Sequence, residues 1–131
     1  MASIGSRDTK PEILLRSLLH REGFRFRVHK KGLPGRPDIL LPKFGTIIFV
    51  NGCFWHNHGC KFSHIPETRR QFWEEKLGRN KQRDKENTKA LAKLGFRVAV
   101  VWECTLMGNT EHAMQKLIPW IRNARGESLE V

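Results

Sequence analysis

Three side chains that can bind zinc lie within eight residues of one another near the middle of the chain. Cys53, His58 and Cys60 follow the spacing C-x4-H-x-C, and thiolates together with neutral imidazole form the ligand set that selects zinc. A structural zinc takes four ligands, and Cys104 is available downstream. The alternative is buried thiols and ordinary loop histidines, but such close spacing favours zinc. An odd number of cysteines and the lack of a secretory signal disfavour a disulfide framework.

Asp38 is a candidate ligand for a second metal. It lies at a predicted strand edge in a basic neighbourhood, where a carboxylate suits a hard cation such as Mg2+ that bridges protein and phosphate. The alternative is a turn aspartate after Pro37. Glu12 is either the capping-box partner of Thr9 or an acid near Asp38. His56 is either a further zinc ligand or a general acid–base group. We expect the remaining histidines to be surface or loop residues: His20, His29, His64 and His112.

The charge balance indicates a polyanionic partner. The 131 residues include 24 Lys and Arg against 13 Asp and Glu, a formal charge of +11 with a pI near 10.2, and nucleic acid is the default partner of such a surface. The length predicts one domain over residues 1–131. No apolar run approaches membrane-spanning length, which argues against a membrane partner. Free thiols without a signal peptide predict the reducing cytoplasm.

Aromatic and basic residues indicate how nucleic acid would be bound. Phe54 and Trp55 are adjacent between the presumed zinc ligands, and Trp73 follows another aromatic on a predicted helix. Such side chains either belong to the core or insert between bases. A cluster of basic residues follows, which is either a solvated face or a phosphate-binding surface: Arg69, Arg70, Lys76, Arg79, Lys81, Arg83 and Lys85.

Hydrophobic periodicity predicts an α/β domain with a mixed sheet and helices on both faces. The expected order is αβββααβα, with strands over 24–28, 38–41, 46–50 and 97–102 and with helices that begin near Thr9, Pro66, Asn80 and Thr110. We expect a break near Gly78 and a kink or interruption at Pro119. Asp38 enters one strand and Asn51 leaves its hairpin neighbour, so both should lie at one edge of the sheet near the zinc loop.

Several sequence blocks together resemble the very short patch repair (Vsr) endonucleases. The blocks are PGRPD at 34–38, GCFWH at 52–56, FWxxKxxRNxxRD at 72–84, GFRV at 95–98 and WEC at 102–104. The resemblance runs from about Arg7 to Cys104. It implies a zinc-containing restriction-endonuclease-like fold and an enzyme that nicks DNA on the 5′ side of the thymine in a T:G mismatch left by deamination of 5-methylcytosine.

The resemblance also implies roles for individual residues. Asp38 and the carbonyl of Val50 would hold catalytic Mg2+, His56 would be the catalytic histidine, and Glu12 would be a supporting acid. The structural zinc ligands would be Cys53, His58, Cys60 and Cys104. DNA contacts would come from Phe54, Trp55, Trp73, Arg36, Lys76, Arg79 and Lys81.

Two features differ from the family pattern. Asn51 occupies a position that often carries a titratable residue in this family; it can orient water but cannot accept a proton. Residues 1–8 are expected to be a flexible, truncated remnant of an N-terminal arm. We expect a monomer in the cytoplasm, associated with the nucleoid, whose further partners are other mismatch-repair proteins. The competing hypotheses are a non-catalytic zinc module that binds distorted DNA and a nuclease of the same fold with another substrate.

Overall fold

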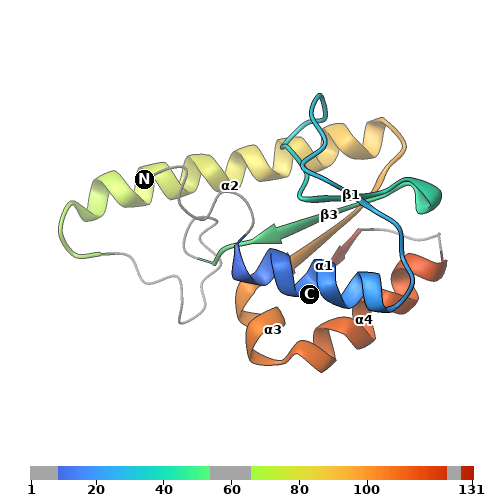
Figure 1. The fold of residues 1–131 in the computed structure, drawn as a ribbon. Helices are drawn as coiled ribbons and strands as arrows, with labels where there is room; N and C mark the ends of the chain where they lie inside the picture. Colours follow the sequence, from blue (N-terminus) through green and yellow to red (C-terminus); the bar gives the residue numbers. More distant parts are fainter. Residues whose placement is uncertain (1–8, 54–65, 124–127) are drawn as a thin grey trace.

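A five-stranded mixed sheet runs through the centre of the molecule (Figure 1). The computed structural model describes residues 9–53, 66–123 and 128–131. The strands lie in sequence order, with antiparallel pairing from β1 to β3 and parallel pairing from β3 to β5. Their bounds are β1 Arg27–Val28, β2 Ile39–Leu41, β3 Thr46–Asn51, β4 Arg97–Trp102 and β5 Leu129–Glu130. This architecture confirms the α/β class and is compatible with the expected restriction-endonuclease-like fold.

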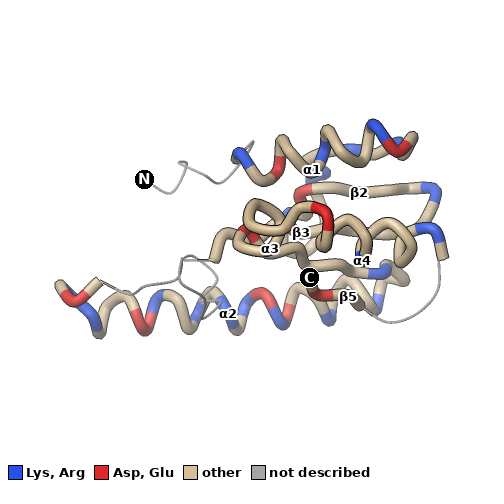
Figure 2. The backbone as a smooth tube through the Cα atoms, turned by 90° about the horizontal axis from the view of Figure 1, so that it is seen from below, with Lys and Arg blue, Asp and Glu red and all other residues tan. Residues whose placement is uncertain are grey.

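Helices cover both faces of this sheet, as predicted. The described α-helices are α1 (Lys10–Arg21), α2 (Arg70–Lys93), α3 (Glu103–Gly108) and α4 (Thr110–Asn123), and a short 3-10 helix, η1 (Pro42–Phe44), connects β2 to β3. Figure 2 shows α1 and α2 on opposite sides of the strands. None of the helices in the described ranges is long and apolar enough to cross a membrane.

Alternation along the strands divides the core into two clusters, because successive strand residues point to opposite faces. The larger cluster joins α1, α3 and α4 to the sheet through residues that include Leu15, Leu106, Leu117, Ile48 and Val101. The smaller cluster joins the second half of α2 to the other face through Leu91, Leu40, Ile47 and Val98.

The prediction of two helices separated at Gly78 is wrong. The structure has a single 24-residue helix, α2, which begins at Arg70 rather than near Pro66. A glycine inside a helix costs only about 1 kcal/mol relative to alanine, and the neighbouring turns offset that cost. Leu77 is fully buried beside it. Side-chain pairs four residues apart follow the exposed face: Arg70–Glu74, Gln71–Glu75 and Gln82–Glu86.

Three other expectations also differ from the structure. The first strand is shorter than 24–28 and contains only Arg27–Val28. Pro119 does not interrupt α4, because the apolar face of that helix, with Leu117 and Ile121 fully buried, continues on both sides of it. The sequence patterns missed α3 and β5; β5 is only two residues long and joins the sheet edge by pairing with β4.

Arg97 joins elements at the end of the sheet where β4 begins. Its guanidinium lies 3.9 Å from the ring centroid of Trp120 and donates a 2.6 Å hydrogen bond to the Trp120 carbonyl oxygen. A second contact, 3.4 Å long, reaches the Thr46 hydroxyl. Burial lowers the pKa of the Arg97 guanidinium below its ordinary value, because desolvation disfavours the charged form. These contacts hold α4 against β3 and β4.

The continuity of α2 yields a testable prediction about Gly78. A methyl group at this position meets no atom within 4 Å, so Gly78→Ala should raise the free energy of unfolding by about 0.5–1 kcal/mol by stiffening the unfolded chain. Urea denaturation followed by circular dichroism measures the change. Gly95→Ala is the matched control: that site is equally open, but its φ of +94° disfavours a side chain, so this variant should be destabilised. A Gly78→Ala protein less stable than the parent would contradict a continuous helix.

Candidate active site and metal centre

The hairpin of β2 and β3 brings Asp38 to the end of β3. In the antiparallel register Ile39 pairs with Ile48. Asp38 precedes Ile39 and therefore lies beside the last residues of β3. The Val50 amide donates a 2.7 Å hydrogen bond to Asp38 Oδ2. This bond orients the carboxylate and confirms that Asp38 lies at the end of the sheet where β3 ends. A carboxylate has about four lone-pair positions, so accepting this bond is compatible with binding a cation.

Helix α1 brings Glu12 to the same place. Thr9 is the N-cap of α1, and its hydroxyl oxygen accepts a 3.4 Å hydrogen bond from the Glu12 amide, as the capping pattern predicted. The Glu12 residue is only 3% exposed, and its Oε2 lies 3.5 Å from Nε2 of His29. One ligand atom each from Glu12, His29 and Asp38 can be chosen so that all three lie within 4.8 Å of one another. Among the described residues, this is the group with the composition and spacing to hold a metal ion.

His29 is the member of this cluster that the sequence patterns missed, since we expected a surface or loop histidine. It follows β1 directly, and its amide donates a 3.2 Å hydrogen bond to the Asp38 carbonyl. The signal that could have identified it is the register of the first hairpin, in which Val28 pairs with Ile39 and places His29 opposite Asp38.

The loop between β1 and β2 contains two residues other than glycine with left-handed backbones. His29 has a φ of 50° and Arg36 a φ of 49°. This conformation is uncommon for residues with a side chain and costs of order 1–3 kcal/mol at each position. Such strain concentrates where a chain must place functional groups, and here both residues lie on the loop that connects β1 to Asp38. The predicted DNA contact Arg36 is exposed on this loop.

Two of the four predicted zinc ligands leave the sheet side by side. The parallel register pairs Asn51 with Trp102, so Cys53 and Cys104 each lie two residues beyond a paired position. Cys53 is fully buried and its amide donates a 3.3 Å hydrogen bond to Glu103 Oε1. Both cysteines are thiols rather than disulfide partners. A pair of thiols on neighbouring strand ends is compatible with half of a zinc site.

Asn51 lies on the other side of the sheet from Glu12. Its side chain is buried and lines a groove of about 620 Å³ together with Lys81 and Lys85 of α2 and Trp102 of β4. By contrast, the preceding Val50 packs against the core cluster on the α1 side. Strand alternation therefore separates the side chain of Asn51 from the Glu12 side of the site. Asn51 and the predicted DNA contact Lys81 therefore face the same groove.

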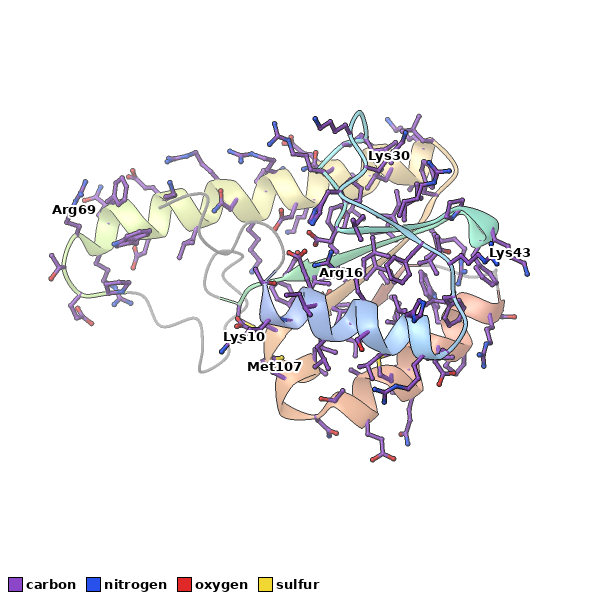
Figure 3. All side chains as sticks on the ribbon, viewed as in Figure 1. Lys10, Arg16, Lys30, Lys43, Arg69 and Met107 are labelled. Carbon is purple, nitrogen blue, oxygen red and sulfur yellow. The ribbon has the colours of Figure 1, made fainter. Side chains whose placement is uncertain are left out.

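Helix α2 carries the remaining described DNA-contact candidates along its length. Figure 3 shows Arg69 at the far end of this helix, away from the sheet. Trp73 is half-buried and lies edge-on to Phe72, with 5.3 Å between ring centroids. Lys76 is half-buried, whereas Arg79 and Lys81 are exposed. Acidic residues also lie on this helix, so its surface carries both charges (Figure 2).

The other predicted site residues lie outside the described part of the chain. They are Phe54, Trp55, His56, His58 and Cys60. The described sequence ends at Cys53 and resumes at Pro66, so these residues stay predictions from the sequence pattern and the resemblance.

Comparisons with known proteins agree with the sequence resemblance. The family described as DNA mismatch endonuclease Vsr matches residues 1–62. The DNA mismatch endonuclease Vsr of Escherichia coli is 45% identical over 125 residues, which cover 92% of this chain and 80% of that protein. The type II nicking enzyme V.XorIIP of Xanthomonas oryzae pv. oryzae is 45% identical over 120 residues, 90% of this chain and 88% of the relative. The type II nicking enzyme V.NmeAIP of Neisseria meningitidis is 43% identical over 126 residues, with 95% and 90% covered.

These relatives share more than 40% identity over nearly the whole chain. Two of the motifs that carry the resemblance, PGRPD at 34–38 and WEC at 102–104, reach the end of β3 through Asp38 and Trp102. The chain belongs to the Vsr family of DNA mismatch endonucleases.

Proposed function

We propose that this DNA endonuclease nicks one strand of duplex DNA on the 5′ side of the thymine in a T:G mismatch, by hydrolysis of a phosphodiester bond assisted by Mg2+. Such mismatches arise when 5-methylcytosine is deaminated. Family membership supports the reaction class. The observation that carries the metal assignment is the cluster of Glu12, His29 and Asp38 at the end of β3.

The donor atoms of this cluster suit a divalent cation. Mg2+ prefers oxygen ligands and is held in nucleic-acid enzymes by one or two carboxylates together with phosphate oxygens. Asp38 and Glu12 supply two carboxylates, and the Val50 backbone is already hydrogen-bonded to Asp38. Asp38 and the carbonyl of Val50 would hold the ion. Bound there, Mg2+ would stabilise the negative charge that develops on the phosphate during hydrolysis.

The other residues would act on the attacking water and the leaving group. His56 would accept a proton from the water or donate one to the leaving oxygen, since imidazole exchanges protons near neutral pH. Glu12 would orient the water from the α1 side. Asn51 lies on the other face of the sheet from Glu12, so it would orient solvent on the groove side rather than beside Glu12, and its amide cannot accept a proton.

Zinc would have a structural role. The thiols of Cys53 and Cys104 leave neighbouring strand ends, and His58 and Cys60 would complete four ligands. A zinc ion with four protein ligands has no open position for a substrate. The site would fasten the segment after β3 to the strand end where the catalytic residues lie.

DNA binding would combine phosphate contacts with insertion of aromatic side chains. The net charge of +11 supports a surface that binds phosphates, with Arg36, Lys76, Arg79 and Lys81 as contacts. Phe54, Trp55 and Trp73 would insert into the duplex beside the mismatch. We further propose a monomer that works on chromosomal DNA in the cytoplasm and meets other mismatch-repair proteins there.

Replacing Asp38 by Asn tests the metal assignment. An asparagine can still accept the hydrogen bond from Val50, so the fold should survive. Affinity for a T:G duplex should hold or rise because a negative charge near phosphates is removed. Nicking in Mg2+ should fall at least about a hundredfold, since the charge of a metal ion contributes several kcal/mol to such reactions. The measurement pairs a gel-shift titration with the nicking rate on one labelled T:G duplex.

A matched control for this experiment is Glu22→Gln. Glu22 follows α1 and forms an exposed ion pair with Arg122 at 3.3 Å, so the variant removes one negative charge far along α1 from Glu12. It should nick at the parental rate. An Asp38→Asn protein that nicks as fast as the parent would overturn the metal assignment. A parent protein that nicks no mismatch in Mg2+ or Mn2+ would favour the non-catalytic binding module.

The zinc proposal predicts about one tightly held zinc ion per chain. Cys104→Ala should lose zinc and yield an insoluble or loosely folded protein, because binding energy in a structural zinc site is folding energy. Elemental analysis of purified protein and a thermal melt measure both effects. Cys104→Ser is a second variant that retains the size of the side chain but not the thiolate. Well-folded parent protein without zinc would refute the proposal.

Trp55→Ala tests the aromatic contribution to mismatch recognition. Trp55→Ala should weaken binding to a T:G duplex more than binding to a T:A duplex, so the preference for the mismatch should fall. Affinity for T:A DNA should change less, because the phosphate contacts remain. Leu94→Ala serves as the control, since Leu94 is 60% exposed at the end of α2. Affinity should also weaken steeply with salt, as counterion release requires. An unchanged preference for the mismatch in a folded Trp55→Ala protein would exclude Trp55 from mismatch recognition.

A further inference from the structure

His29 is placed to add a nitrogen ligand to the carboxylates of the candidate metal site. Its imidazole is 13% exposed and its Nε2 lies 3.5 Å from Oε2 of Glu12, whose side chain is 4% exposed. The third member, Asp38, contributes a carboxylate oxygen within 4.8 Å of the other two atoms. Ligand atoms on one shared ion, with bonds of about 2.1 Å, lie about 3 Å apart when adjacent and about 4.2 Å apart when opposite. Closing this cluster on an ion therefore requires side-chain shifts of less than about 1 Å.

Two backbone features hold His29 in this position. Its amide is hydrogen-bonded to the Asp38 carbonyl, so the two residues that flank the β1–β2 loop are held together. Its φ of 50° lies in the left-handed region, which a residue with a side chain adopts at a cost. An exposed loop histidine would not need this partial burial.

A simple ion pair between Glu12 and protonated His29 is a weaker explanation of the cluster. Charge-assisted hydrogen bonds in such pairs are about 2.7–2.9 Å long, whereas the two atoms here are 3.5 Å apart. Asp38 also brings a second carboxylate oxygen within 4.8 Å of the other two atoms, which a pair of Glu12 with His29 does not explain. Two carboxylates and an imidazole around one point form a ligand set for a divalent cation.

The chemistry of that ligand set points to a particular class of cation. Carboxylates suit Mg2+ and Mn2+, whereas imidazole adds a donor that first-row transition metals accept more readily than Mg2+. We propose that His29 is a metal-coordinating residue that makes the site prefer Mn2+ over Mg2+. This inference rests on the proposed cation site at Asp38 and the Val50 carbonyl. It deepens that proposal by adding His29 as a ligand, with Glu12 as the second carboxylate at the ion, and by naming the ion that His29 favours.

Direct metal binding to the full, zinc-loaded chain tests the inference. Mn2+ is titrated into the protein and the free ion is followed by electron paramagnetic resonance, with Mg2+ affinity obtained by competition. His29→Asn is the test variant, because asparagine tolerates a left-handed backbone but is too short to replace the imidazole. His20→Asn is the control, since His20 is exposed near the end of α1.

The expected result is a loss of Mn2+ affinity of at least about tenfold in His29→Asn, comparable to the loss on mutating groups that support a metal ligand. Mg2+ affinity should change by less than about threefold, and His20→Asn should match the parent. Electron spin echo modulation from a directly bound nitrogen should be present in the parent complex and weakened or lost in His29→Asn. This spectroscopic change distinguishes coordination from a purely structural role.

Three outcomes would overturn the inference, and they separate it from the proposed function. Equal loss of Mn2+ and Mg2+ affinity would show that His29 only positions Glu12. Mn2+ binding that depends on Asp38 but not on His29 would remove His29 from the ligand set and leave the cation site intact. If the parent and Asp38→Asn bind Mn2+ equally weakly, the proposed cation site itself fails together with this inference.

Discussion

The parallel pairing of β3 with β4 determines where the candidate functional residues of this domain meet. Six residues of each strand are in register, from Thr46 beside Arg97 to Asn51 beside Trp102. The thiols of Cys53 and Cys104 follow at the same end of the sheet. The antiparallel hairpin of β2 and β3 then adds Asp38, and α1 adds Glu12. A slip of one residue in the central pairing would turn the side chains of one strand to the wrong face.

Charge is distributed unevenly between the site and the rest of the molecule. The chain as a whole carries a formal charge of +11, which favours a phosphate backbone as partner. The end of β3 nevertheless gathers two carboxylates, one of them on the buried residue Glu12. A basic surface attracts DNA, whereas carboxylates at the point of reaction would repel its phosphates unless a cation lies between them. This combination gives a physical reason to place a metal-assisted reaction at this end of the sheet.

Helix α2 extends beyond the end of the sheet at which the candidate site lies. Its 24 residues span about 36 Å at the usual rise per residue. Only Leu77 and Leu91 of its side chains are fully buried, so most of the helix surface is open to a partner. Figure 1 shows its second half against the sheet and its first half projecting past the end of β3. The helix can thus hold aromatic and basic residues at a distance from the cluster of Glu12 and Asp38.

The sequence by itself determined the class of the fold and the family, and it supplied the predictions about the chemistry of the site. Alternation identified β4 over 97–102, capping residues identified the start of α1 at Thr9, and the spacing of Cys53, His58 and Cys60 predicted a zinc site. The motif residues also identified the family, which the relatives confirmed. These signals are local, because they depend on periods of two or 3.6 residues or on ligands close together in the chain.

Only the tertiary structure decided which distant residues meet. His29 reached Glu12 and Asp38 through the register of β1 with β2, and strand alternation sent Asn51 to the α2 side. Helix α2 continues through Gly78 because the burial of Leu77 and Leu91 offsets the cost of a glycine inside a helix, which is about 1 kcal/mol relative to alanine. Strand β5 formed by pairing with β4. Register and burial depend on contacts between residues far apart in sequence, and local periodicity carries no information about them.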